Sequence, residues 1–332
     1  MESKEKLTIV LPPKVTRALA EGFNIAAEHL YLLVLPLLAD LLIWLGPKLR
    51  IYELFGGYFG QTFAELTRNA PQELATQFDT LQKAAEAIIE HTNLMSMISS
   101  FPFSIPTLLG GVATLDGPVP NLKIIEIRSV FLVLCLFLLI GIIGFITGMF
   151  YLIIIAQASD AESKHITLRR FGRTTLNLTL FILAILGILL VLMLPFSCFF
   201  TILSLLSISL AQIVLLILFL GVAWLIIPMF YIFHGIFLSE LNLKEALSLS
   251  FQMARWVSGP TSFFIVLSVI ILQGLNLIWT IPAANSWLLL VGIIGNAFVT
   301  TALICASFVL YQQNLQWLSA NAEIIKKGFI QK

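Results

Sequence analysis

Two ionisable side chains lie inside apolar stretches that are long enough to cross a bilayer, and they are the best candidates for chemistry. Asp40 and His234 are these residues. An ionisable group within a membrane is costly and often marks an ion or substrate site. Structural pairing is the favoured interpretation for both, through a hydrogen bond for His234. The expected partners of Asp40 are Lys48 or Arg50, or a polar group such as Gln273 or Asn276.

No motif for catalysis, metal binding or nucleotide binding accompanies these two residues. The sequence contains no HExxH, no paired carboxylates, no Ser/His/Asp grouping and no P-loop. Its three cysteines, Cys135, Cys198 and Cys305, lie in apolar stretches without CxxC or Cys/His spacing, so we expect small packed hydrophobes. We therefore expect no metal, no cofactor and no enzyme; an intramembrane enzyme would rest on Asp40 and His234 alone.

Composition places the chain in a membrane. Hydrophobic residues make up 59% of it and charged residues 11%, against roughly a quarter charged in soluble proteins. No Asp, Glu, Lys or Arg occurs between Arg173 and Glu240, or between Arg255 and Glu323. About 20 apolar residues cross a bilayer as a helix, so each silent stretch holds two crossings. The pattern predicts an all-α polytopic membrane bundle, and the net charge of +1 does not suggest a nucleic-acid partner.

Six crossings are expected, joined near 201–208 and 281–286 by short turns without Lys or Arg. The expected spans are 30–46, 129–157, 177–200, 209–238, 261–280 and 287–316. Lys and Arg gather on the opposite side, which predicts cytosolic N- and C-termini in an inner (cytoplasmic) membrane. The terminal lysines in this argument are Lys4, Lys6, Lys14, Lys326, Lys327 and Lys332. Pro12 and Pro13 interrupt the first apolar run, so no cleaved signal peptide is expected.

A spacing of eighty residues relates three parts of the chain. It separates Tyr151, Tyr231 and Tyr311, and it also separates Ser159, Ser239 and Ser319. We interpret this as a threefold repeat, in which a short amphipathic helix precedes a crossing out and a crossing back that ends in Tyr-x7-Ser. Internal repeats are common in polytopic proteins. The alternative is chance recurrence of residues that are frequent in membrane helices.

Residues 47–128 are expected as an extracytoplasmic insertion within a single transmembrane domain spanning 1–332. After Pro71, a helix is expected that lies outside the membrane and covers the bundle. Its apolar face would hold Leu74, Phe78, Leu81, Ala85 and Ile88. The following sequence SSFPFSIPTLLGG, at 99–111, is apolar but too short and too proline-rich to span. A buried structural plug is favoured over a functional re-entrant loop.

Other polar and small residues carry weaker signals. A basic patch is formed by Arg169, Arg170 and Arg173. Its charges would either bind anionic lipid of the inner leaflet or only determine the topology. Gly144 and Gly148 form a GxxxG that favours close backbone packing, with dimerisation as the alternative. Uncharged polar residues in the spans are Gln212, Gln273, Asn276 and Asn296. They would suit lipid or apolar cargo better than an ion-coupled carrier.

The stretch LNLKEALSLSFQMARWVSGP, at 241–260, carries an acid, Ala-Leu, then Ser and an aromatic residue: Glu245, Ala246, Leu247, Ser250 and Phe251. It resembles the membrane domain of the glycerophosphodiester phosphodiesterase family and related bacterial membrane proteins, as does the ending FVLYQQNLQ at 308–316. The resemblance implies a six-crossing bundle that is sometimes fused to a catalytic domain. The His-Arg-Gly and Glu-Asn-Thr signatures of that domain are absent here, so the resemblance implies no activity.

The sequence thus predicts an integral membrane protein that interacts with membrane lipids. A scaffold, assembly or regulatory subunit, with other membrane subunits as partners, is the first hypothesis. A transporter or lipid-handling protein is the alternative, favoured by the repeats, Asp40 and the proline-broken segment.

Overall fold

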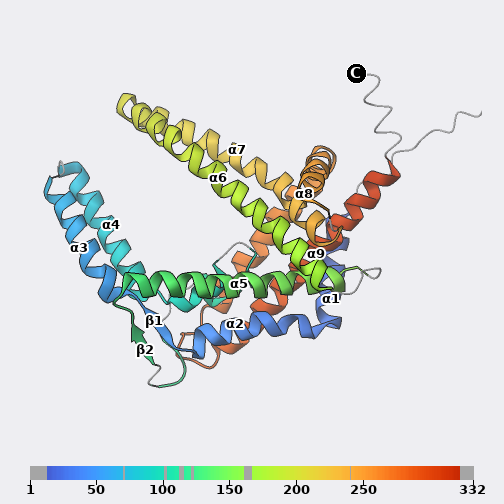
Figure 1. Ribbon diagram of the computed structural model, residues 1–332, viewed down its shortest axis with the longest axis horizontal. Helices are drawn as coiled ribbons and strands as arrows, with labels where there is room; N and C mark the ends of the chain where they lie inside the picture. Colours follow the sequence, from blue (N-terminus) through green and yellow to red (C-terminus); the bar gives the residue numbers. More distant parts are fainter. Residues whose placement is uncertain are drawn as a thin grey trace, which may run out of the picture. The chain divides into compact units, whose positions relative to one another are not determined.

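The computed structural model describes residues 13–69, 72–100, 103–111, 116–120, 123–160, 167–239 and 241–321. The described residues do not include Lys4, Lys6, Pro12, Pro71 or the lysines after 321. What the sequence predicts from these residues is therefore not tested by the structure. The described chain is almost entirely helical, which confirms the predicted all-α polytopic fold (Figure 1).

Among the described residues, five helices are long and apolar enough to cross a membrane. They are α5 (Val130–Ala158), α6 (Leu168–Leu206), α7 (Ile208–Phe237), α8 (Leu243–Trp279) and α9 (Leu289–Ala320). A sixth span would be a bent pair, in which α1 (Val15–Glu28) meets residues Leu30–Leu45 at 89°. Residues Leu30–Leu33 are a 3-10 turn, η1, that leads into α2 (Val34–Leu45). The first predicted crossing is therefore the short second arm of a bent element.

The helices extend beyond the predicted spans. The turn predicted near 201–208 is present but is much shorter than predicted, because α6 continues to Leu206 and α7 begins at Ile208. Nothing in the apolar run after 200 ends a helix until Ser207, whose hydroxyl accepts a hydrogen bond from the Leu210 amide as an N-cap. The 39 residues of α6 measure about 58 Å at 1.5 Å per residue, well over the ~30 Å bilayer core.

A kink divides α8 into the two parts that the sequence predicts. Val257 has non-helical angles (φ −123°, ψ 25°), and Pro260 follows it. Proline removes one backbone donor and clashes with the preceding turn, so the helix bends at this point. The Thr261 hydroxyl donates to the Val257 carbonyl oxygen (2.7 Å) and satisfies an acceptor at the kink.

The chain divides into two compact units, which we describe separately. Unit 1 comprises Met1–Glu28, Ile153–Val269 and Ala302–Lys332, and unit 2 comprises His29–Leu152 and Ile270–Thr301. Helices α5, α8 and α9 contribute residues to both units. The expectation of a single domain stays a prediction.

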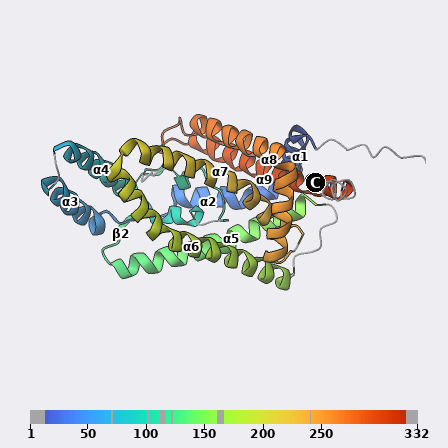
Figure 2. The same cartoon turned by 90° about the horizontal axis from the view of Figure 1, so that it is seen from above.

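In unit 1, α1 packs against the second half of α9. Val15 and Ala18 share a buried cluster with Ala306 and Leu310. A Cβ atom at Gly22 would overlap the backbone of α9 at Ala306, so this close approach requires glycine. Helices α6 and α7 run side by side as a hairpin (Figures 1 and 2).

Unit 2 contains the insertion. Helices α3 (Tyr52–Asn69) and α4 (Gln72–His91) form a hairpin, and the helix predicted after Pro71 is confirmed as α4 (Figures 1 and 2). Leu81 and Ile88 on its predicted apolar face are exposed (54% and 64%). Strand β1 (Lys48–Arg50) pairs in parallel with β2 (Ile124–Glu126). The chain between α4 and β2 forms two 3-10 turns, η2 (Leu94–Ser99) and η3 (Leu109–Gly111).

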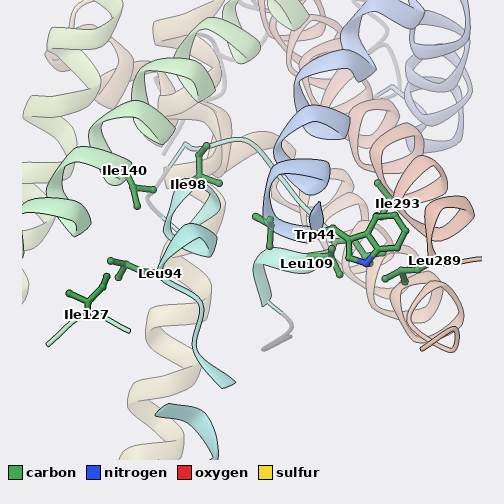
Figure 3. Packing of buried hydrophobic residues seen from close by; sticks show 10 residues of the cluster. Trp44, Leu94, Ile98, Leu109, Ile127, Ile140, Leu289 and Ile293 are labelled. Atoms are coloured by element: carbon green, nitrogen blue, oxygen red, sulfur yellow. The ribbon is translucent and has the colours of Figure 1, made fainter. Parts of the chain in front are cut away.

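The core of unit 2 gathers side chains from α2, η2, η3, α5 and α9 (Figure 3). Trp44 is fully buried and packs beside Leu109, Leu289 and Ile293. Its indole nitrogen donates to the carbonyl oxygen of Ala284 (2.7 Å), which satisfies the polar end of this large side chain. Residues of both 3-10 turns thus belong to the core.

Candidate functional site

The centre of the candidate site is segment 94–111 of unit 2, which contains η2 and η3 but no α-helix and which we call the inserted segment; its residues Phe101 and Pro102 lie outside the described part. Asp40, on α2, anchors it. The Asp40 carboxylate is fully buried, and its two oxygens accept hydrogen bonds from the backbone amides of Leu108 (3.0 Å) and Leu109 (2.9 Å). These amides lie at the start of η3, where a 3-10 turn leaves N–H groups free.

The partners predicted for Asp40 are therefore wrong. Lys48 donates instead to the carbonyl oxygens of Ile43 (2.6 Å) and Trp44 (3.0 Å), at the end of α2. Arg50 pairs with Glu126 (3.1 Å). Because the partners of Asp40 are backbone amides, no side-chain pattern in the sequence identifies them.

The glycines of α5 bring the inserted segment deep along that helix. A Cβ atom at Gly144 would overlap the carbonyl group of Ile98, and one at Gly148 would overlap Phe103 and Ser104. Gly144 is fourteen residues from the start of α5, about 21 Å along its axis. The predicted close packing is confirmed, but the neighbour is the backbone of the inserted segment, including η2, rather than a second α-helix. This contact favours a re-entrant segment.

Local contacts fix the rest of the segment. The Asn93 side chain accepts hydrogen bonds from the amides of Leu49 and Met95 (both 3.1 Å), which ties the start of η2 to β1. Phe103 has a φ of 64°, in the left-handed region that side chains disfavour, and is the single such non-glycine residue in the described part of the chain. Backbone strain of this kind is often stored at functional sites.

A polar cleft of about 370 Å³ lies between the inserted segment, the end of α8 and the start of α9. Its polar lining residues are all uncharged: Ser99, Ser100, Thr107, Gln273, Asn276, Asn296 and Thr300. Asn296 is only 3% exposed, and its amide nitrogen has no partner among the described residues. The side-chain oxygen of Asn276 is likewise buried without a partner there.

This polar lining has a physical reason. Irregular backbone at membrane depth is tolerated where protein covers it or where it lines a water-filled cavity. The polar lining of the cleft matches the second condition on one side of the inserted segment, and the buried cluster around Leu109 matches the first. Gln273, Asn276 and Asn296 stand out in the sequence as polar residues in spans, but Ser99 and Thr107 give no such signal.

His234 lies in unit 1, with partners of its own. Its Nδ1 donates to the Phe230 carbonyl oxygen (2.6 Å), and its Nε2 is 2.8 Å from the hydroxyl oxygen of Ser307. The imidazole ring is 1% exposed and is surrounded by aromatic rings of Phe230, Phe233 and Phe308. This geometry fits a hydrogen-bonded core histidine.

The three tyrosines spaced by eighty are all fully buried. In unit 1, the Tyr231 hydroxyl bonds to Thr261 and accepts from Asn314 (2.8 Å), and Tyr311 bonds to Ser239 (3.1 Å). In unit 2, Tyr151 bonds to Thr301 (2.8 Å). The serines differ more, since Ser159 is buried and Ser319 is exposed. The threefold repeat itself stays a prediction.

The basic patch in unit 1 has mixed roles. Arg170 is buried, and its guanidinium donates to the carbonyl oxygen of Phe237 (3.3 Å), the last residue of α7. A cation there favourably meets the negative end of the helix dipole. Arg173 donates to Asn242 (2.7 Å), and it is exposed like Arg169. Only Arg169 and Arg173 therefore present exposed charge.

Among the described residues, no group of three His, Cys, Asp or Glu side chains has the geometry to hold a metal ion. Comparison of the chain with protein-family models, curated proteins and solved structures gives no match. The resemblance to the glycerophosphodiester phosphodiesterase membrane domain therefore stays a prediction.

Proposed function

We propose that this polytopic membrane protein handles lipid or carries a solute, and that the cleft in unit 2 receives an uncharged polar group. The observation that carries the proposal is the combination of an irregular segment at depth along α5 with a cleft of uncharged polar residues. Ligand sites typically measure about 300–1,000 Å³, and the cleft lies at the lower end of this range.

The wall of the cleft is held in place, as a binding site requires. The hydrogen bonds to Asp40 fix the inserted segment at Leu108 and Leu109. Because Gly144 has no side chain, it leaves room for the backbone of the segment at Ile98. A wall that is fixed before the ligand arrives loses little conformational entropy on binding.

Reconstitution into liposomes tests the proposal. Scrambling of fluorescent lipids and release of trapped neutral solutes would be compared with protein-free vesicles. Asn296→Leu should reduce the transport rate, while Gln316→Leu, at an exposed position on α9 outside the cleft, should not. Rates equal to those of empty vesicles for every lipid and solute would contradict the proposal.

A scaffold or assembly subunit is the second candidate, because of the α6/α7 hairpin. Its tip is highly exposed, with Leu205 at 82%, Leu206 at 76% and Ile208 at 70%. Lipid covers such a surface in any membrane protein, so the exposed hairpin alone does not require a partner. Purification in mild detergent would decide: the scaffold hypothesis requires a stoichiometric partner that a Leu205→Lys variant loses.

A further inference from the structure

We infer that the cleft selects a hydroxyl-rich, uncharged group, namely a polyol that is either free or the head group of a neutral glycolipid. The inference rests on the proposed function and names its substrate class. It follows from three properties of the cleft: its hydrogen-bonding groups, its lack of charge and its size.

The hydrogen-bonding groups include both donors and acceptors. Within the described part of the chain, the Asn296 amide nitrogen is a donor without a partner, and the Asn276 side-chain oxygen is an acceptor without one. Ser99 and Ser100 both donate to the carbonyl oxygen of Ser96 (3.0 and 3.1 Å), so their hydroxyl oxygens remain available as acceptors. A hydroxyl group donates and accepts at once, so neighbouring hydroxyls match such a wall better than a pure donor or a pure acceptor does.

The segments that form the cleft carry no charge. Neither 94–115 nor 256–322 contains Asp, Glu, Lys, Arg or His. The nearby carboxylate of Asp40 is fully buried, and backbone amides occupy both of its oxygens. A phosphate or an ammonium group would therefore lose water without meeting an opposite charge, which is strongly unfavourable. A neutral ligand avoids this penalty.

The size admits more than a few waters. At about 30 Å³ per water molecule, 370 Å³ corresponds to about a dozen. A ring with several hydroxyls can replace many of these waters and make the same hydrogen bonds. A cleft that holds water alone is the competing outcome.

Binding to the purified full-length protein tests the inference. In detergent, titration calorimetry would use myo-inositol and glucose, with inositol 1-phosphate and choline as charged comparators. In nanodiscs of phosphatidylcholine with or without monoglucosyl diacylglycerol, native mass spectrometry would detect retained glycolipid. Saturable binding of the neutral polyols identifies a free ligand, and retention of glycolipid alone identifies a lipid head group; each supports the inference.

Two variants locate the binding. Asn296→Leu should weaken the affinity about tenfold or more, because a buried donor to the ligand is lost. Gln273→Leu changes an exposed residue of the cleft lining. It provides a second test of binding at the cleft if Asn296→Leu does not fold. Gln316→Leu, the matched control on α9, should bind like the wild type.

Three results would overturn the inference: no binding of any polyol or glycolipid, equal affinity for inositol 1-phosphate, or wild-type affinity in both cleft variants. Its failure is distinguishable from failure of the proposed function. Lipid or solute transport without polyol binding would reject the substrate class alone, and polyol binding without transport would reject the transport function.

Discussion

Replacing Asp40 by asparagine should loosen the inserted segment without unfolding the protein. The carboxylate accepts two backbone hydrogen bonds, at 2.9 and 3.0 Å, and is fully buried. An asparagine side chain has a single oxygen, so one of the amides of Leu108 and Leu109 would face an NH₂ group. The variant loses one charge-assisted hydrogen bond and leaves a donor unsatisfied.

The magnitude follows from these two bonds. A hydrogen bond to a charged group contributes about 1.5–3 kcal/mol, and an unsatisfied buried donor costs about 1–3 kcal/mol. Removing a buried charge offsets part of this loss, because burial itself disfavours the carboxylate. We expect a net local destabilisation of about 1–3 kcal/mol, which corresponds to an increase of roughly 5- to 150-fold in local opening.

Hydrogen exchange with mass spectrometry measures this opening directly. Peptides that cover 105–111 should exchange faster in Asp40→Asn by that factor, while peptides of α6 and α7 should not change. Asp79→Asn is the control, because Asp79 pairs with Lys83 (2.7 Å) on the exposed face of α4. Equal protection of 105–111 in the wild type and both variants would refute the anchoring role of Asp40.

Three further predictions follow from the structure. In a detergent unfolding assay, Gly144→Ala should destabilise the protein by about 1–3 kcal/mol or displace the inserted segment, since the added carbon overlaps Ile98. Gly187 has open space around it, so Gly187→Ala should be neutral in this assay or stabilise the protein by up to about 1 kcal/mol. Burial lowers the pKa of Lys48 from 10.5 to about 8. Between pH 8 and pH 10.5 the unfolded state therefore binds more protons than the folded state, and the free energy of unfolding should rise by up to about 3 kcal/mol across this range. Tyr231→Phe should cost about 1–3 kcal/mol in the same assay, because the Asn314 amide loses its acceptor.

Each of these predictions has an outcome that contradicts it. Equal stabilities of the Gly144 and Gly187 variants would reject the close backbone contact. For Lys48, the decisive comparison is Lys48→Met, whose free energy of unfolding should lack the rise above pH 8; an unchanged rise would assign it to other groups. Tyr31→Phe, at an exposed tyrosine, should leave stability unchanged, and a loss equal to that of Tyr231→Phe would reject the role of the buried hydroxyl.

The sequence predicts the fold class well, because membrane helices follow from one-dimensional quantities. The uncharged stretches from Arg173 to Glu240 and from Arg255 to Glu323 locate α6 to α9, and the span predicted to begin at 261 starts close to the kink in α8. Helix ends are less predictable. An apolar stretch of 201–206 resembles either a turn in the interface or another helical turn, and the capping geometry of Ser207 selects the second.

The candidate site is harder to predict, because backbone groups build much of it. Asp40 is conspicuous in the sequence, but its partners are amides of Leu108 and Leu109, which any residue type except proline would supply. Gly144 and Gly148 predict a close contact without identifying the neighbour. Asn276 and Asn296 are visible as polar residues in spans, whereas their meeting at one cleft depends on how α8 and α9 pack in unit 2.

The inserted segment is the most informative departure from helical structure in this protein. A helix satisfies its own backbone groups, and a helix of apolar residues would occupy the same volume without help. Segment 94–111 instead depends on the Asp40 carboxylate, the Asn93 side chain and the bare backbone of Gly144. Each of these is a point at which one substitution destabilises the arrangement. What the segment adds to the fold is its polar surface on the cleft, which is the surface that the proposed ligand would contact.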